Sequence, residues 1–208
     1  MGTRGAVGFL SNGIEKITYN HFDSYPEGLG NGVLNFLHTI INIEELKIKV
    51  NNIILIDEKV EPTIKQIKQC IAAKTVDMEA SEQSYKDWYC LLRHAQGNLE
   101  KYIEVRLMPD SKDFLLDSLF CEWAYIINFD TNKLEIYKGF NKNKNTEGRY
   151  VNVKVPENGY YGVKLISEID LFNLPEKFLE GYDENTEKRA LKLIYNESWK
   201  NIKLQLNE

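Results

Sequence analysis

The sequence predicts an α+β fold in which two β-hairpins and one further strand form an antiparallel sheet covered by helices. Three observations support this class: a strand–turn–strand pattern near the N-terminus, a second one after residue 120, and apolar residues at helical spacing between them. The chain lacks the alternating strand and helix units of a doubly wound parallel sheet. With 208 residues, we expect one domain over 1–208, with a mainly helical layer at about 33–115.

The first hairpin lies at the N-terminus. Residues 4–10 combine glycines with apolar side chains, and Ser11-Asn12-Gly13 supplies a turn because Asn and Gly tolerate positive φ. Residues 14–19 alternate in polarity and are rich in residues that favour strands, so they form the returning strand.

The region between the hairpins is predicted to be helical. Pro26 is typical of a first helical turn, and apolar side chains recur at helical spacing over 33–41. Gly28, Gly30 and Gly32 each cost about 1 kcal/mol inside a helix, so either something packs close to this backbone or the helix begins after them. Further helices are expected from Pro62 to about Ile71, at 85–95, at 99–107 and at 187–199, while 44–55 is ambiguous between helix and strand.

The second hairpin follows the helical region. Residues 121–129 read as a strand buried on both faces, 130–133 as a turn, and 134–138 as the returning strand. Residues 141–149 form a polar loop that we expect to be exposed and mobile, and 162–169 give the fifth strand.

Composition excludes several classes of protein. A formal net charge of −5 and a pI of about 5.4 argue against general nucleic-acid binding or binding to a membrane surface. No apolar run approaches the roughly 18–20 residues of a membrane span. The three cysteines show no metal-ligand spacing, and no signal-peptide pattern precedes them, so we expect reduced thiols in the cytoplasm and no metal.

The glycines at 28, 30 and 32 do not form a nucleotide-binding fingerprint. Their spacing differs from that motif and no strand leads into them, so no cofactor is predicted.

Polar side chains gather directly after the first hairpin. They are Asn20, His21, Asp23, Ser24 and Tyr25. A loop that leaves a sheet toward a helix is a common place for a site, and His21 could carry a proton near neutral pH with Asp23 orienting it. The alternative is structural: Asp23 or Ser24 caps the helix while His21 packs over Tyr25.

Four residues at the starts of two strands complete the candidate set. Arg4, beside Thr3, offers a planar fork for carboxylate or phosphate. Glu122 and Trp123 open a largely apolar strand, so the carboxylate must pair or face a cleft. A Glu122–Arg4 salt bridge is the structural interpretation, and a ligand contact or general base is the functional one. The charges of Asp57-Glu58 and Arg149 are predicted to be solvated.

Three segments resemble a family of uncharacterised bacteriophage and prophage proteins. They are Thr3-Arg4-Gly5, the run Tyr-Asn-His-Phe-Asp-Ser-Tyr-Pro at 19–26, and Cys-Glu-Trp-Ala-Tyr-Ile-Ile-Asn-Phe-Asp at 121–130. The resemblance spans much of the chain. It implies a phage origin and, with it, the cytoplasm of the host bacterium, but no established activity.

A weaker resemblance is to N-terminal nucleophile hydrolases of the bile-salt-hydrolase and acyltransferase type. Thr3 would take the nucleophile position, residues 20–23 would match the loop after the first hairpin, and 122–138 is similar to a later hairpin of that family. That chemistry uses the α-amine of the nucleophile residue as base, so it would require removal of Met1 and Gly2.

Together these features predict a phage accessory protein that binds a small polar ligand, a nucleotide-like signal being one candidate, or a host factor. Counteracting a host defence is one role for such a protein. The expected ligand-binding residues are Arg4, Asn20, His21, Asp23, Tyr25, Glu122 and Trp123. Two alternatives stay open: an amidohydrolase with Thr3 as nucleophile or a hydrolase based on His21 and Asp23, and a protein-binding inhibitor with an acidic surface. Whether the protein is an enzyme, and its oligomeric state, are left undecided.

Overall fold

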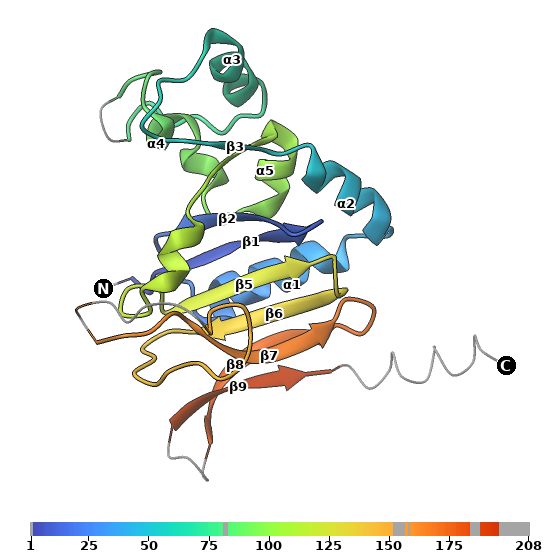
Figure 1. Cartoon of the computed structure of the whole chain (residues 1–208). Helices are drawn as coiled ribbons and strands as arrows, with labels where there is room; N and C mark the ends of the chain where they lie inside the picture. The colour runs from blue at the N-terminus through green and yellow to red at the C-terminus, as the bar shows by residue number, and fades with distance from the viewer. Residues whose placement is uncertain (1, 81–82, 152–156, 158, 184–187, 196–208) are drawn as a thin grey trace, which may run out of the picture.

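A five-stranded sheet forms the centre of the molecule (Figure 1), in a computed structural model that describes residues 2–80, 83–151, 157, 159–183 and 188–195. The strand order is β2-β1-β5-β6-β7. The strands are β1 (Gly5–Ser11), β2 (Ile14–Asn20), β5 (Trp123–Asn128), β6 (Lys133–Lys138) and β7 (Lys164–Asp170). The α+β class, both predicted hairpins and the fifth strand are therefore confirmed.

The sheet is mixed, whereas the sequence predicted an antiparallel one. β1 and β5 pair in parallel, with Gly5 opposite Trp123, and the other three pairings are antiparallel. Turn residues fix the direction of the two strands within a hairpin, but they do not determine how one hairpin meets another. The two hairpin turns also meet, because the backbone N–H groups of Asn12 and Gly13 donate to the Asp130 carboxylate at 2.7 and 2.8 Å.

Helices and a small hairpin cover one face of the sheet. In Figure 1, α1 lies behind the sheet, with α2 and α5 beside β1 and β2 and with α3 and α4 farthest from β7. The helical elements are η1 (Pro26–Gly30), α1 (Asn31–His38), α2 (Ile43–Asn51), α3 (Ile64–Ala72), α4 (Trp88–Leu91), η2 (Arg93–Ala95), α5 (Leu99–Val105) and η3 (Lys112–Leu116). The main hydrophobic core lies between the sheet and these helices except η3, whose Leu115 belongs to a second core with Ala6 and Ile17.

Several predicted helices are shorter than expected. Residues 85–95 break into α4 and η2, and the helix at 99–107 ends at Val105 because Arg106 adopts a left-handed conformation with φ +58°. The ambiguous stretch 44–55 contains both α2 and the short strand β3 (Ile54–Ile56), which pairs in parallel with β4 (Leu107–Pro109).

The predicted C-terminal helix at 187–199 is wrong where the structure describes it. Residues 188–194 form β9 (Lys188–Ile194), which pairs with β8 (Lys177–Asp183). Leu191 and Leu193 are partly buried with Lys192 exposed between them, an alternation that suits a strand. Residues 196–199 lie outside the described residues.

The segment after β6 covers the opposite face of the sheet, and six of the nine residues at 141–149 are exposed as predicted, whereas two are buried. Asn141 and Asn145 are buried, and the Asn145 side-chain amide donates to the Val163 carbonyl at 3.1 Å. Arg149 lies 2.7 Å from Glu135 and 3.1 Å from Glu15, so its charge is paired rather than solvated. These contacts tie the segment to β2 and β6.

Two further findings bear on function. No helix within the described ranges is long and apolar enough to cross a membrane. Cys70, Cys90 and Cys121 are free and buried.

Candidate functional site

Arg4 and Glu122 lie side by side, but backbone groups make most of the contact, and the described part of the chain contains no ion pair between their side chains. The Glu122 N–H donates to the Arg4 carbonyl at 3.0 Å, and the Arg4 N–H donates to Glu122 Oε1 at 3.3 Å. The Arg4 guanidinium lies over the ring of Phe120, 5.6 Å from its centre. The Arg4 side chain is thus directed away from the sheet and is exposed.

His21 is held by its aromatic neighbours. Its Nδ1 lies 2.6 Å from the Tyr19 hydroxyl, and its ring meets the edge of Phe22 at a centroid distance of 4.2 Å. Burial raises the pKa of Tyr19, while the positive charge of Arg4 acts in the opposite direction. His21 therefore contacts Tyr19, a residue that the prediction did not include, and the charge of Arg4 acts on the same phenol.

The other polar residues of the loop have structural contacts. The buried Asn20 amide donates to Ser24 Oγ at 2.8 Å and to the Phe22 carbonyl, and Asp23, at φ +52°, accepts the Leu29 N–H on its carbonyl at 2.8 Å. No hydrogen bond between His21 and Asp23 is present in the described part of the chain. The His21–Asp23 hydrolase therefore stays a prediction without a contact that supports it.

Tyr25, Trp123 and Thr3 lie apart from the Tyr19 cluster. The Tyr25 carbonyl accepts the N–H groups of Gly28 and Gly30, so this residue anchors the helix entry. Trp123 is only 4% exposed and stacks on Tyr125. Thr3 is half-buried, and its carbonyl accepts the Ser24 N–H at 3.1 Å. A nucleophilic role for Thr3 stays a prediction.

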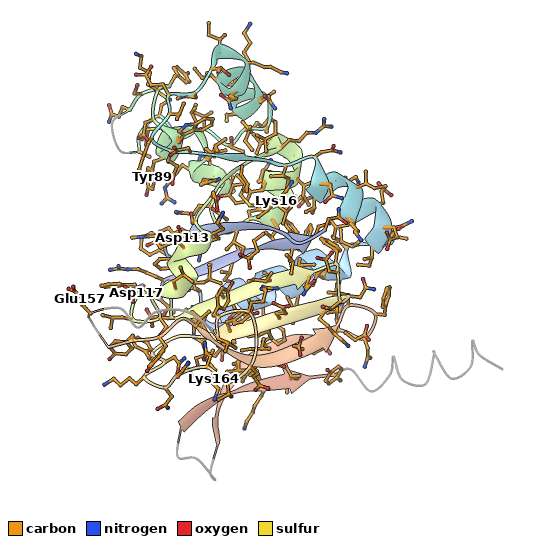
Figure 2. The ribbon with its side chains drawn as sticks, viewed as in Figure 1. Lys16, Tyr89, Asp113, Asp117, Glu157 and Lys164 are labelled. Atoms are coloured by element: carbon orange, nitrogen blue, oxygen red, sulfur yellow. The ribbon has the colours of Figure 1, made fainter. Side chains whose placement is uncertain are left out.

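A cavity of about 140 Å³ opens beside the outer edge of β2, next to this cluster. It is lined by Thr18, Tyr19, Glu58, Trp88, Tyr89, Leu92, Arg93, Gln96, Tyr102, Pro109 and Ser111. Figure 2 labels Tyr89, which lies between α4 and the β1–β2 hairpin. The cavity is therefore bounded by β2 on one side and by the helical layer on the other, and Tyr19 belongs both to its wall and to the His21 cluster.

Two buried hydroxyl groups lie in the cavity wall. Tyr102 is 2% and Thr18 1% exposed, and their hydroxyl oxygens are 3.4 Å apart. Burial raises the pKa of Tyr102 to about 12, the bond from Thr18 lowers it, and the charge of Glu58 raises it, so the phenol is protonated at neutral pH. Each hydroxyl has one hydrogen to donate, and this single bond uses one of the two. The second hydrogen is available to a molecule in the cavity.

Glu58 brings a carboxylate to the same cavity. Its pKa is raised, first by burial and then by the negative charges of Asp87 and Asp57. Within the described residues, no hydrogen bond or ion pair joins the Glu58 carboxylate to a partner. Glu58 is exposed, as predicted, so its carboxylate borders the cavity at a side that is open to water.

The edge of β2 adds backbone groups to the site. The Ile17 carbonyl accepts the Ser111 N–H at 2.8 Å and so points away from β1. Because backbone groups alternate in direction along an antiparallel strand, the N–H and carbonyl of Tyr19 face the same outer edge.

A larger groove, of about 670 Å³, lies between the end of α1, α2 and α5. Its walls include Phe36, Ile40 and Ile103, and two of its charges, Lys49 and Glu45, pair with each other at 2.7 Å on the surface. It offers apolar surface but no buried polar group of the kind that Tyr102 provides. We therefore place the candidate site in the smaller cavity.

Most residues of the cavity carried no signal in the sequence. Tyr19 is next to the predicted loop and could have been included, but Glu58, Tyr89, Arg93 and Tyr102 come from separate segments that only the fold brings together. Among the described residues no group of three or more His, Cys, Asp or Glu side chains is placed to hold a metal ion.

Comparison with known proteins adds no family to this description. The chain matches no family model, and no curated protein or solved structure matches it.

Proposed function

We propose that this protein binds a small polar molecule in the cavity beside β2. One observation carries the proposal: a cavity between β2 and the helices is lined by a carboxylate that has no partner in the described chain and by two buried hydroxyls that share one long hydrogen bond. An unmet donor on a buried hydroxyl such as those of Thr18 and Tyr102 costs about 1–3 kcal/mol, and a bound ligand would recover it.

The size of the cavity limits the ligand. Sites for drug-sized molecules usually measure about 300–1,000 Å³, whereas this one measures about 140 Å³. It therefore suits a molecule, or part of a molecule, of about one ring. His21 contacts Tyr19 at the cavity wall, where it is available to groups of a ligand that extend outside the cavity.

The biological setting comes from the resemblance to phage proteins and is also a proposal. A phage accessory protein with such a site would bind a small molecule of the host, and counteracting a host defence is one use of that binding. The proposal concerns binding and assigns no reaction to the site, since no hydrogen bond joins His21 to Asp23 in the described chain and Thr3 is not among the residues that line the cavity.

The proposal is tested by a ligand screen in which NMR signals of the cavity residues are monitored. Small amines, carboxylates, amides and single-ring heterocycles are added to isotopically labelled protein, and the amide signals of Thr18, Tyr19, Tyr102 and Ser111 are followed by NMR. We expect at least one compound to shift these signals in a saturable way. Ser111→Phe, which places a ring at the cavity wall, should abolish the shifts, whereas Ser167→Phe on β7, at the opposite edge of the sheet, should keep them.

A screen in which no compound moves these four signals would refute the proposal. The same holds if binding persists unchanged in a folded Ser111→Phe protein. If that variant does not fold, Tyr102→Phe takes its place, because it removes a hydroxyl of the cavity and keeps the ring.

A further inference from the structure

Two charged side chains line the cavity, and they differ in their contacts: Arg93 is held by other side chains of the protein, whereas Glu58 is not. Arg93, the one cation among the lining residues, donates to Gln96 Oε1 at 2.8 Å and lies over the Tyr89 ring, 5.5 Å from its centre. Glu58 has no such partner in the described chain, and the charges that act on its carboxyl are those of Asp57 and Asp87. The acidic end of the cavity therefore lacks a counter-ion.

Aromatic rings surround the same space. Tyr19, Trp88, Tyr89 and Tyr102 line the cavity, and the Trp88 indole is fixed by its hydrogen bond to the Val60 carbonyl at 2.7 Å. Ring faces attract cations by about 0.5–2 kcal/mol, and Arg93 already uses the Tyr89 face in this way. Aromatic walls beside a carboxylate are the surroundings that suit an organic cation.

We propose that the ligand carries an ammonium group and that Glu58 is its counter-ion in the cavity. This inference rests on the proposed function and specifies the class of ligand. One N–H of the ammonium would donate to the Glu58 carboxylate and another to a hydroxyl oxygen of the Thr18–Tyr102 pair, while the apolar part of the molecule lies against the rings.

Two other classes of ligand fit the site less well. A metal ion of the calcium type takes six to eight oxygen ligands, and Glu58 is the one carboxylate that lines the cavity. An anion would meet Glu58, with Asp57 and Asp87 close by, and would have to compete with Gln96 for Arg93.

Three probes of matched shape test this inference: benzylamine, benzyl alcohol and benzoate. Their affinities are measured by isothermal titration calorimetry on the full chain at neutral pH. We expect benzylamine to bind at least about tenfold more tightly than benzyl alcohol, and benzoate to bind most weakly. Glu58→Gln should reduce the affinity for benzylamine by about tenfold and remove the preference over the alcohol. The matched control is Glu61→Gln, an exposed position paired with Lys86, which should leave all three affinities unchanged.

The pH dependence provides a second readout. The raised pKa of Glu58 means that this carboxyl takes up a proton earlier than an ordinary glutamate as the pH falls. Benzylamine stays protonated between about pH 8 and about pH 5, so its affinity should fall over this range in the wild type and stay constant in Glu58→Gln. Asp57 and Asp87, near the Glu58 carboxyl, and Arg93 and Tyr102 in the cavity are the other titratable or charged groups, and they are present in both proteins.

The inference is overturned if benzyl alcohol or benzoate binds as tightly as benzylamine, or if Glu58→Gln does not change the affinity for the amine. In that case any shift of the cavity signals in the NMR screen would still support the proposed function. If no compound of any class shifts those signals, the proposed function fails as well.

Discussion

Lys16 places a charge on the face of β2 that packs against helices. It is only 7% exposed, and its Nζ donates to the carbonyls of Val50, Asn51 and Ile53 at 2.9, 2.9 and 2.5 Å. These carbonyls lie at and just after the end of α2, where helix carbonyls lack intrahelical partners. Burial lowers the pKa of Lys16, and the favourable position at a helix C-terminus opposes that cost.

Replacing Lys16 should therefore destabilise the protein. Lys16→Met removes the Lys16 donor from three carbonyls, of which the Val50 carbonyl keeps the Ile53 N–H, and we expect the free energy of unfolding to fall by about 2–3 kcal/mol in urea denaturation. Lys65→Met, at an exposed position on α3, should change it by less than about 0.5 kcal/mol. Equal losses in the two variants would mean that the Lys16 contacts contribute nothing.

Single residues of the site were partly predictable. Arg4 and His21 were chosen because their side chains are chemically versatile and adjoin a hairpin, and both do contact or influence Tyr19. Glu58 was correctly expected to be exposed, but the sequence does not indicate that Asp87 and the buried Tyr102 will lie near its carboxylate, because both come from later segments of the chain.

At the scale of elements, the packing around the entry to α1 shows why the sequence has glycines at 28 and 30. A Cβ at Gly28 would overlap the Asp23 carbonyl oxygen, and one at Gly30 would touch the Tyr125 ring at 3.0 Å. A Cβ at Gly32 would meet nothing within 4 Å. Close packing therefore explains two of the three glycines, and the third has no such reason.

Alanine substitutions should separate these two cases. Gly32→Ala adds a better helix former at an exposed position of α1 and should raise the free energy of unfolding by about 0.5–1 kcal/mol. Gly28→Ala should lower it by about 1–3 kcal/mol because the loop at Asp23 must move. Denaturant melts of both variants measure this, and an equal change of the same sign would contradict the packing argument.

Elements that carry a local sequence signal, such as turn residues, were predicted well. Elements that depend on pairing with another strand were not. The turn residues Asn12 and Gly13 fixed the first hairpin, since both adopt positive φ. By contrast, the apolar residues of 188–194 fit both the spacing of a helix and the alternation of a strand. This segment is a strand because it pairs with β8.

At the scale of the whole molecule, Arg149 joins the two hairpins. It lies between Glu15 on β2 and Glu135 on β6, and Glu135 also accepts from Tyr137 at 2.6 Å and from Asn128 at 2.6 Å. Burial is the largest cause that raises the pKa of Tyr137, so its phenol stays protonated and donates to Glu135. The Glu135 side chain is 6% exposed, which makes this pairing a buried one.

Replacing Arg149 should destabilise the protein. Arg149→Met leaves Glu135 as a buried charge with only neutral donors, and we expect the free energy of unfolding to fall by about 3 kcal/mol. Lys133→Met, which removes an exposed pair with Asp170 at 3.4 Å, should cost less than about 1 kcal/mol. Limited proteolysis should also cleave the 139–151 segment faster in Arg149→Met. Unchanged stability and cleavage would show that the segment is held by its buried asparagines alone.

The global arrangement was beyond what the sequence could predict. The parallel pairing of β1 with β5 and the cavity beside β2 both depend on residues about 100 positions apart, such as Thr18 and Ser111. Local periodicity carries no information about contacts at this separation. The predicted site residues lie in the loop after β2 and at the starts of β1 and β5, whereas the cavity lies at the outer edge of β2.

The most direct test of this account is a crystal structure of the full chain with benzylamine. We predict that the ligand occupies the cavity, with its nitrogen within hydrogen-bond distance of the Glu58 carboxylate and its ring against Trp88 or Tyr102. Benzylamine bound at another site while the cavity beside β2 stays without it would contradict the account.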